Sequence, residues 1–157
     1  MLVFIVLSIA NAMEKTESAT REIEETGNYL QLFFYRAPKK NHDSIARNLK
    51  QFIQWFEKNG VRIEYHQLGI SETQAAIDSA KQSGMDVLDN ISTTLSTAEH
   101  EEEVWMELQY FRDHKHCEDI YAKMMQDKNL EPIGKEFFGL VTQGKKLITG
   151  GFNRLKE

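Results

Sequence analysis

The chain has 157 residues, of which 41% are hydrophobic and 27% are charged. This size and composition predict one globular domain that can bury its own core without metals or disulfides. The net charge is −5 and the Lys and Arg residues are scattered, which argues against a nucleic-acid-binding protein. The single cysteine, Cys117, leaves no internal disulfide and favours a reducing, cytoplasmic location.

The chain opens with an apolar run, MLVFIVLSIANA, over residues 1–12. The run is too short for a membrane span, which needs about 20 apolar residues, so no span is predicted. It ends in Ala-Asn-Ala, which resembles a cleavage site, but it lacks the leading Lys or Arg of a signal peptide. A misassigned start codon, export of the protein and an interfacial anchor all stay open. Residues 1–28 are expected to form an apolar segment and a mobile polar arm.

Four later segments have the length and composition of β-strands. The predicted strands are 28–36, 61–69, 103–112 and 145–152. In the last of them, Gly150 and Gly151 indicate a bulge or a close backbone approach.

Two helices are predicted after the first and the third of these strands. Apolar residues recur at helical spacing from Ile45 to Phe56, and Asn59-Gly60 supplies a stop. Asp113 is placed to cap the second helix. Its inner stripe is Cys117, Ile120, Tyr121 and Met124. A shorter helix is expected around residues 136–140.

Between the second and third strands, residues 70–103 predict an inserted helical hairpin. Ser71 and Gln74 fit a capping box for its first helix, which Gly84 ends. The second apolar stripe consists of Val87, Leu88, Ile91 and Leu95.

The order of these elements predicts an α+β fold for residues 29–157, taken as a single domain. Strand, helix, strand, insertion, strand, helix and strand follow one another, which is the βαββαβ pattern of a ferredoxin-like antiparallel sheet with both helices on one face. Alternation assigns one set of side chains to the face that the helices cover. This set is Leu30, Leu32, Phe34, Val61, Ile63, Tyr65, Val104, Met106, Leu108 and Tyr110.

The same alternation leaves four aromatic side chains on the other face. They are Phe33, Tyr35, Trp105 and Phe111. An apolar patch of this size on a free face marks a partner or ligand surface. A second copy of the chain would cover it in a homodimeric α+β barrel, and the inserted hairpin is the competing cover.

Three short motifs resemble domain-of-unknown-function family 1428. They are APKKN after the first strand, HCEDIYAKMMQDKNL in the second helix and GKKLITGGF at the end. The family's helix pattern, H-R-D-x-V-N-x-K-V-M-x-D-P-R-L, is met in register by His116, Glu118, Ile120, Lys123, Met125, Asp127 and Leu130, with Glu118 and Ile120 as near-matches. Its final pattern, G-K-R-M-I-Y-G-G-F, is met by Gly144, Lys145, Ile148, Gly150, Gly151 and Phe152.

This resemblance implies a dimeric ferredoxin-like α+β barrel and brings no established reaction. The chain departs from the family at two places. Residues 70–103 replace its Ser-Phe-Pro segment, and Thr142-Gln143-Gly144 replaces its Phe-Asp-Gly. Any family pocket bounded by those segments is therefore in question.

The candidate ligand-binding residues come from the aromatic face. They are Phe33, Tyr35, His66, Trp105, Glu107 and Gln109. A carboxylate and an imidazole enclosed among aromatic rings would have shifted pKa values and could act as a general base on an acidic C–H group. The competing interpretation places Glu64 and His66 at an exposed strand end and pairs Glu107 across the dimer.

His114, His116 and Cys117 are the residues that most resemble a metal or thiol site. On a helix at about 100° per residue, the two histidines lie about 160° apart and cannot share one ion. Cys117 belongs to the inner stripe, where thiols are usually inert. No metal and no cofactor is therefore expected, and the phosphate-loop, dinucleotide and nucleophile-elbow motifs are absent.

Two functional hypotheses follow from the sequence. The first is a small homodimeric α+β barrel that binds a small, partly apolar ligand between the sheet and the insertion, with enzyme activity left open. The alternative is a non-catalytic structural or interaction protein whose sheet face only forms the dimer.

Overall fold

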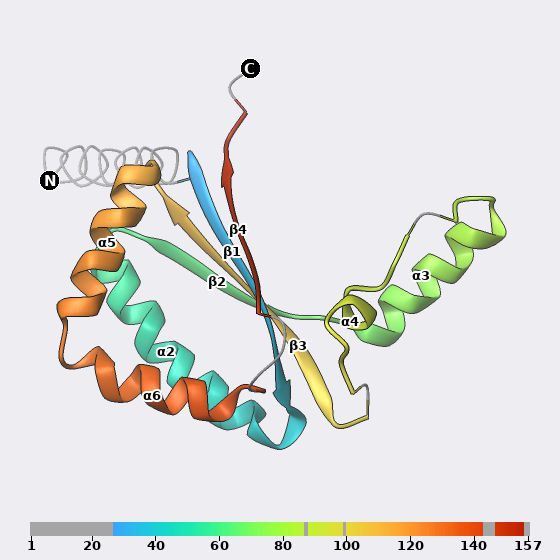
Figure 1. Cartoon of the computed structure of the whole chain (residues 1–157), viewed down its shortest axis with the longest axis horizontal. Helices are drawn as coiled ribbons and strands as arrows, with labels where there is room; N and C mark the ends of the chain where they lie inside the picture. Colours follow the sequence, from blue (N-terminus) through green and yellow to red (C-terminus); the bar gives the residue numbers. More distant parts are fainter. Residues whose placement is uncertain (1–26, 87, 99, 143–146, 156–157) are drawn as a thin grey trace, which may run out of the picture.

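The computed structural model describes residues 27–86, 88–98, 100–142 and 147–155. These residues form an α+β fold around a four-stranded, fully antiparallel sheet (Figure 1), as the sequence predicts. The order of strands across the sheet is β2-β3-β1-β4. The strands are β1 (Tyr29–Pro38), β2 (Arg62–Gln67), β3 (Glu102–Phe111) and β4 (Ile148–Asn153). The apolar segment at residues 1–12 lies outside the described residues.

Three helices lie together on one side of the sheet (Figure 1). They are α2 (His42–Lys58), α5 (His114–Gln126) and α6 (Leu130–Leu140). A 3-10 turn, η1 (Lys39–Asn41), leads from β1 into α2. The predicted short helix at 136–140 is therefore the last part of a longer helix, α6, and the helical layer has three members rather than two.

Helix α2 ends where Asn59-Gly60 predicts. Gly60 has a φ of +74°, a conformation that costs glycine little because it has no Cβ. The Val61 N–H donates to the carbonyl of Phe56, and the Gly60 N–H donates to that of Glu57, which makes a Schellman motif. The turn brings Val61 and Phe56 into the same core cluster, so α2 and β2 are joined without a loose loop.

Helix α5 begins at the predicted cap. Asp113 is extended, and its Oδ1 accepts a hydrogen bond of 2.7 Å from the backbone N–H of His116. This bond satisfies one of the free N–H groups of the first turn. Cys117 and Ile120 then face the core, as the predicted stripe requires.

The face assignment for β1 and β3 is wrong. Tyr29, Tyr35, Trp105 and Phe111 all pack in the two core clusters under the helices. Alternation therefore turns the neighbouring set outward. That outward set includes Leu30, Leu32, Phe34, Met106 and Leu108, all of which are half-buried. On β2 the predicted inward residues Ile63 and Tyr65 do face the helices.

The insertion between β2 and β3 is helical, as predicted. It consists of α3 (Ile70–Gln82) and the one-turn α4 (Ile91–Thr94), which extend beyond one end of the sheet (Figure 1). α3 is capped by Gly69 rather than by Ser71, while Gly84, with a φ of +86°, follows its end as predicted. Val87 of the predicted second stripe lies outside the described residues.

The insertion covers only one end of the outward face. Arg36, which alternation turns outward, donates a 2.8 Å hydrogen bond to the carbonyl of Ser96 and pairs with Glu102. Helices α3 and α4 lie beyond that end of the sheet, and α2, α5 and α6 lie on the opposite face, so the described helices leave the rest of the outward face open (Figure 1). The inserted hairpin is therefore only a partial cover.

Strand β4 confirms the close approach expected at its glycines. Gly151 pairs with Gln31 of β1, and any Cβ at Gly151 would lie 1.9 Å from the hydroxyl oxygen of Tyr29. The strand starts at Ile148 instead of Lys145, and residues 143–146 lie outside the described residues. No helix in the described part of the chain is long and apolar enough to cross a bilayer.

Loss of the α5 cap should lower stability. We expect Asp113→Ala to reduce the free energy of unfolding by about 1 kcal/mol, because the His116 N–H loses its acceptor. Asp113→Asn keeps an acceptor oxygen and should unfold like the wild type. Urea unfolding followed by circular dichroism measures both, and an Asp113→Ala protein as stable as wild type would contradict the cap.

Candidate functional site

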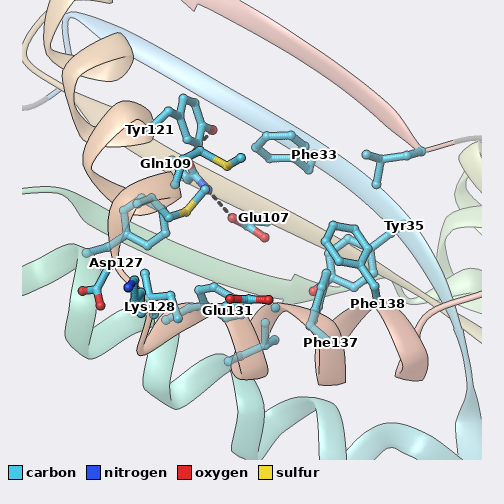
Figure 2. Close-up of a pocket in the computed structure, with 18 residues that line it drawn as sticks. Phe33, Tyr35, Glu107, Gln109, Tyr121, Asp127, Lys128, Glu131, Phe137 and Phe138 are labelled. Atoms are coloured by element: carbon cyan, nitrogen blue, oxygen red, sulfur yellow. Dashed lines mark hydrogen bonds between the residues drawn. The ribbon is translucent and has the colours of Figure 1, made fainter.

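A cavity of about 600 Å³ lies between the sheet and the three helices (Figure 2). Side chains from β1, β3, α2, α5 and α6 line it, and most of them are apolar. The aromatic members are Phe33, Tyr35, Phe52, Phe56, Tyr121, Phe137 and Phe138. This volume and lining are typical of a pocket for a small organic ligand.

Local structure explains why these side chains meet. Phe33 and Tyr35 are two residues apart on β1, so they project from the same face. Phe52 and Phe56 are four apart on α2, one helical turn, and both face the sheet. Gly134 on α6 also lines the cavity, and no atom lies within 4 Å of the place where its Cβ would be. The missing side chain of Gly134 therefore leaves open space at the cavity.

Glu107 brings a carboxylate into this apolar lining. It sits at the centre of β3, opposite Phe33 on one neighbouring strand and Tyr65 on the other. Gln109 Nε2 donates to Glu107 Oε1, and the Tyr121 hydroxyl donates to Gln109 Oε1 over 2.7 Å (Figure 2). This relay orients one carboxylate oxygen and leaves Oε2 without a hydrogen bond from the described residues.

Burial changes the acidity of Glu107. Desolvation raises its pKa from 4.5 to about 7, and the hydrogen bond from Gln109 offsets only part of that effect. Among the described residues, no Lys, Arg or His forms an ion pair with Glu107. Near neutral pH the group therefore exists in both protonation states, as a general acid or base requires.

The hydroxyl of Tyr35 is a second buried polar group. The residue is only 3% exposed, and its hydroxyl has no hydrogen-bond partner among the described residues. Burial and then the charge of Glu107 raise the pKa of Tyr35, so the phenol stays protonated. A buried hydroxyl without a partner is rare. This one is closed off from solvent, so only the ring of Tyr35 is available to line the cavity.

Charged side chains from the end of α5 and the start of α6 also line the cavity. They are Asp127, Lys128 and Glu131 (Figure 2). Trp55 Nε1 donates a 2.8 Å hydrogen bond to Asp127 and is the main reason that the pKa of Asp127 is lowered. Lys135 pairs with Glu131 and lowers its pKa as well. Both carboxylates are therefore ionised at neutral pH.

The structure brings together four of the six predicted ligand-binding residues. Phe33, Tyr35, Glu107 and Gln109 all line the cavity. The cavity lies under the helices, however, and not on a free sheet face or beside the insertion. That part of the prediction is wrong because the faces of β1 and β3 were interchanged.

The other two predicted residues lie elsewhere. Trp105 is buried beside α2, where its Nε1 donates a 2.7 Å hydrogen bond to Glu103 and its ring lies 5.3 Å from that of His42. His66 pairs with Met106 on the outward face, is about half exposed, and lies 3.5 Å from Glu64. It cannot act with Glu107 in this cavity, so a carboxylate-imidazole pair at the site is excluded.

The stretch around His114 and His116 is a capped helix start. His114 is exposed beside Glu118, whereas the ring of His116 is buried against Phe111 and accepts a 3.3 Å hydrogen bond from the Arg112 N–H. Burial lowers the pKa of His116 and raises that of Cys117 to about 11, which keeps the thiol protonated. In the described parts of the chain, no three His, Cys, Asp or Glu side chains gather in a metal-ligand set.

Sequence reasoning missed the helical half of the cavity. Phe137 and Phe138 were assigned to a short helix without a role, and Tyr121 and Met124 were assigned only to the core. The adjacent Phe137 and Phe138 indicate a buried helical segment. Pro132 and two glycines in the same stretch argue against a longer helix, because these residues have low helix propensity. Pro132 is tolerated because it lies in the first turn, where no N–H bond is lost.

Comparison with known proteins leaves the family of this chain open. No family model and no curated protein matches it. The resemblance to domain-of-unknown-function family 1428 therefore stays a prediction.

The pKa of Glu107 makes stability depend on pH. Its pKa is higher in the folded chain, so between about pH 4.5 and 7 the folded state holds a proton that the unfolded state has lost. The contribution of Glu107 to the free energy of unfolding should therefore fall as pH rises through that window. The difference between wild type and Glu107→Gln in urea unfolding measures this contribution.

Glu101→Gln, a change at an exposed carboxylate, is the control for that experiment. It should keep the wild-type pH profile. A difference between wild type and Glu107→Gln that stays constant from pH 4.5 to 7 would show that Glu107 has an ordinary pKa.

Proposed function

We propose that this protein is a homodimeric, ferredoxin-like α+β barrel that binds a small, partly apolar ligand in the cavity beside Glu107. The observation that carries the proposal is the aromatic cavity of about 600 Å³ with the carboxylate of Glu107 on its sheet side. Such a cavity encloses an apolar body, and a few placed polar groups orient it. The ligand site therefore lies between the sheet and α2, α5 and α6.

The connection of the strands supports the ferredoxin-like part of the proposal. Helix α2 joins β1 to β2, helices α5 and α6 join β3 to β4, and the strand order is β2-β3-β1-β4. The βαββαβ arrangement with helices on one face is that of the ferredoxin-like fold. The family resemblance adds support, because that family is similar to dimeric barrels of this type.

The outward face of the sheet supports the dimer. Leu32 and Leu108 are direct partners across β1 and β3, and both are half-buried on that face. Phe152 on β4 is 53% exposed at the same surface. Closed two-fold dimers cover such apolar surface with a second copy of it.

A second candidate function is proton transfer by Glu107. Its pKa of about 7 and its unoccupied Oε2 suit a general base or acid that acts on a bound substrate. Tyr35 and Tyr121 have raised pKa values, and Asp127 and Glu131 have lowered ones, so none of these four described groups would share the proton transfer with Glu107. The remaining alternative is a non-catalytic protein in which the outward face only forms the dimer.

Filling the cavity should prevent ligand binding. Gly134→Leu places a side chain into open space at the cavity and should weaken binding of the neutral fluorescent probe N-phenyl-1-naphthylamine by about tenfold or more. Gly139→Leu, in the same helix but outside the cavity lining, is the matched control and should bind like wild type. Failure of the wild-type protein to bind the probe would favour the non-catalytic interaction protein.

A charge on the outward face should prevent dimerisation. We expect Leu108→Glu to convert the dimer to a folded monomer, because the carboxylate would have to be buried against the partner. Ala122→Glu, on the exposed side of α5, should leave the dimer intact. Light scattering after size-exclusion chromatography gives the mass, and a monomeric wild-type protein would overturn the dimer.

A further inference from the structure

We infer that the cavity selects a hydrophobic cation, an ammonium group carried on an apolar or aromatic body, with Glu107 as its counter-ion. This inference rests on the proposed ligand site and names the chemistry of its occupant. Three features of the cavity support it: an uncompensated carboxylate, an aromatic lining and a free acceptor oxygen.

Other buried carboxylates on β3 are compensated, and Glu107 is not. Glu103 accepts hydrogen bonds from Gln67 (2.8 Å) and Trp105 (2.7 Å) and lies 3.1 Å from His42 Nδ1. Glu102 pairs with Arg36 at 3.1 Å and also accepts from Thr142 and the Ala98 N–H. Glu107 has only the amide of Gln109 among the described residues. A buried charge that lacks a partner is costly, and a ligand cation would remove that cost.

The rings around Glu107 favour a positive charge. The face of an aromatic ring is negative, so a cation within about 6 Å of the ring centre is attracted. Phe33 and Tyr35 lie beside Glu107 in the sheet, and Tyr121 and Phe137 come from the helices. Among the described residues that line the cavity, Asp127 and Glu131 add two carboxylates and Lys128 adds one cation. An anionic ligand would be repelled by the same groups.

The free oxygen of Glu107 matches a group that donates hydrogen bonds. Among the described residues, no hydrogen bond reaches Glu107 Oε2, and an ionised carboxylate can only accept. A protonated amine offers N–H groups to this oxygen. A carbonyl or carboxylate ligand offers none and would leave Glu107 without a partner.

Binding of a cation should depend on the ionisation of Glu107. Because the pKa of Glu107 is about 7, a bound cation favours the ionised form and displaces a proton. The groups that face Glu107 are Tyr35 on β1, Tyr65 on β2, Tyr121 on α5, and Asp127, Lys128 and Glu131 at the α5–α6 junction. The tyrosines have raised pKa values and the two carboxylates lowered ones, so none of these five titrates between pH 6 and pH 8.

Three probes of the same shape and different charge test the inference. They are 1-naphthylmethylamine, a cation; 1-naphthalenemethanol, which is neutral; and 1-naphthoate, an anion. Isothermal titration calorimetry at pH 8 should show the amine binding about tenfold or more tightly than the alcohol, with the naphthoate weakest. The advantage of the amine should shrink by up to about tenfold at pH 6, where Glu107 is protonated.

Two variants test whether the preference for the amine over the alcohol depends on Glu107. Glu107→Gln keeps the shape and the Gln109 hydrogen bond but removes the charge, so amine and alcohol should then bind within about threefold of each other. Glu118→Gln removes an exposed carboxylate on α5 that does not line the cavity and should keep the preference for the amine. Retention of the preference in Glu107→Gln, or equal binding of amine and alcohol to the wild type, would overturn the inference.

The neutral probes separate this inference from the ligand site itself. If naphthalenemethanol and N-phenyl-1-naphthylamine bind and the amine has no advantage, the cavity binds ligands but does not select cations. If no probe binds at any pH, the ligand site is wrong and the inference falls with it. Release of a proton on amine binding, measured in buffers of different ionisation enthalpy, should accompany the expected result.

Discussion

The pleat of β1 and β3 is the constraint on which the other features of this structure depend. β1 is hydrogen-bonded to β3 on one side and to β4 on the other, and its side chains alternate between the two faces of the sheet. Phe33 and Tyr35 therefore point to the same layer as Glu107 and Gln109. The three helices close over that layer, and the outward side chains of the same two strands form an apolar face that the described insertion covers only at one end.

Within the helix-covered layer, burial has different consequences for two carboxylates on one strand. Glu103 and Glu107 are four residues apart and project to the same side. Glu103 is surrounded by donors from α2, β2 and β3, so it is part of the scaffold. Glu107 lies where the helices leave a cavity, and desolvation raises its pKa. A group that is costly to bury and has no structural partner is best explained by the molecule it meets.

The sequence predicted the helices and strands correctly, but it predicted the helix-covered face correctly only for β2. On β2, Arg62 and Glu64 contrast with Val61 and Ile63, so the inward face was assigned correctly. On β1 and β3, both faces carry large apolar residues, as Phe33 beside Phe34 illustrates. There the alternation of side chains does not distinguish an apolar face from a polar one. If the wrong face is taken as buried, every side chain of the strand is assigned to the opposite face. The sequence nevertheless groups Glu107 and Gln109 correctly with Phe33 and Tyr35. That grouping requires only that the four side chains lie on the same face, whichever face the helices cover.

The sequence by itself determined the local features: the Gly60 turn, the Asp113 cap, the helical insertion and the four strands, all of which depend on residues a few positions apart. It also separated His114 from His116, because helix geometry alone does so. The tertiary structure decided that α6 joins the helical layer, that Gly134 and Glu107 line the same cavity, and that His66 lies on the far side of the sheet. Those outcomes depend on which face of the sheet the helices cover and on how β1, β3, α2, α5 and α6 pack. Such contacts join residues far apart in the chain, so the spacing of residues within one element does not predict them.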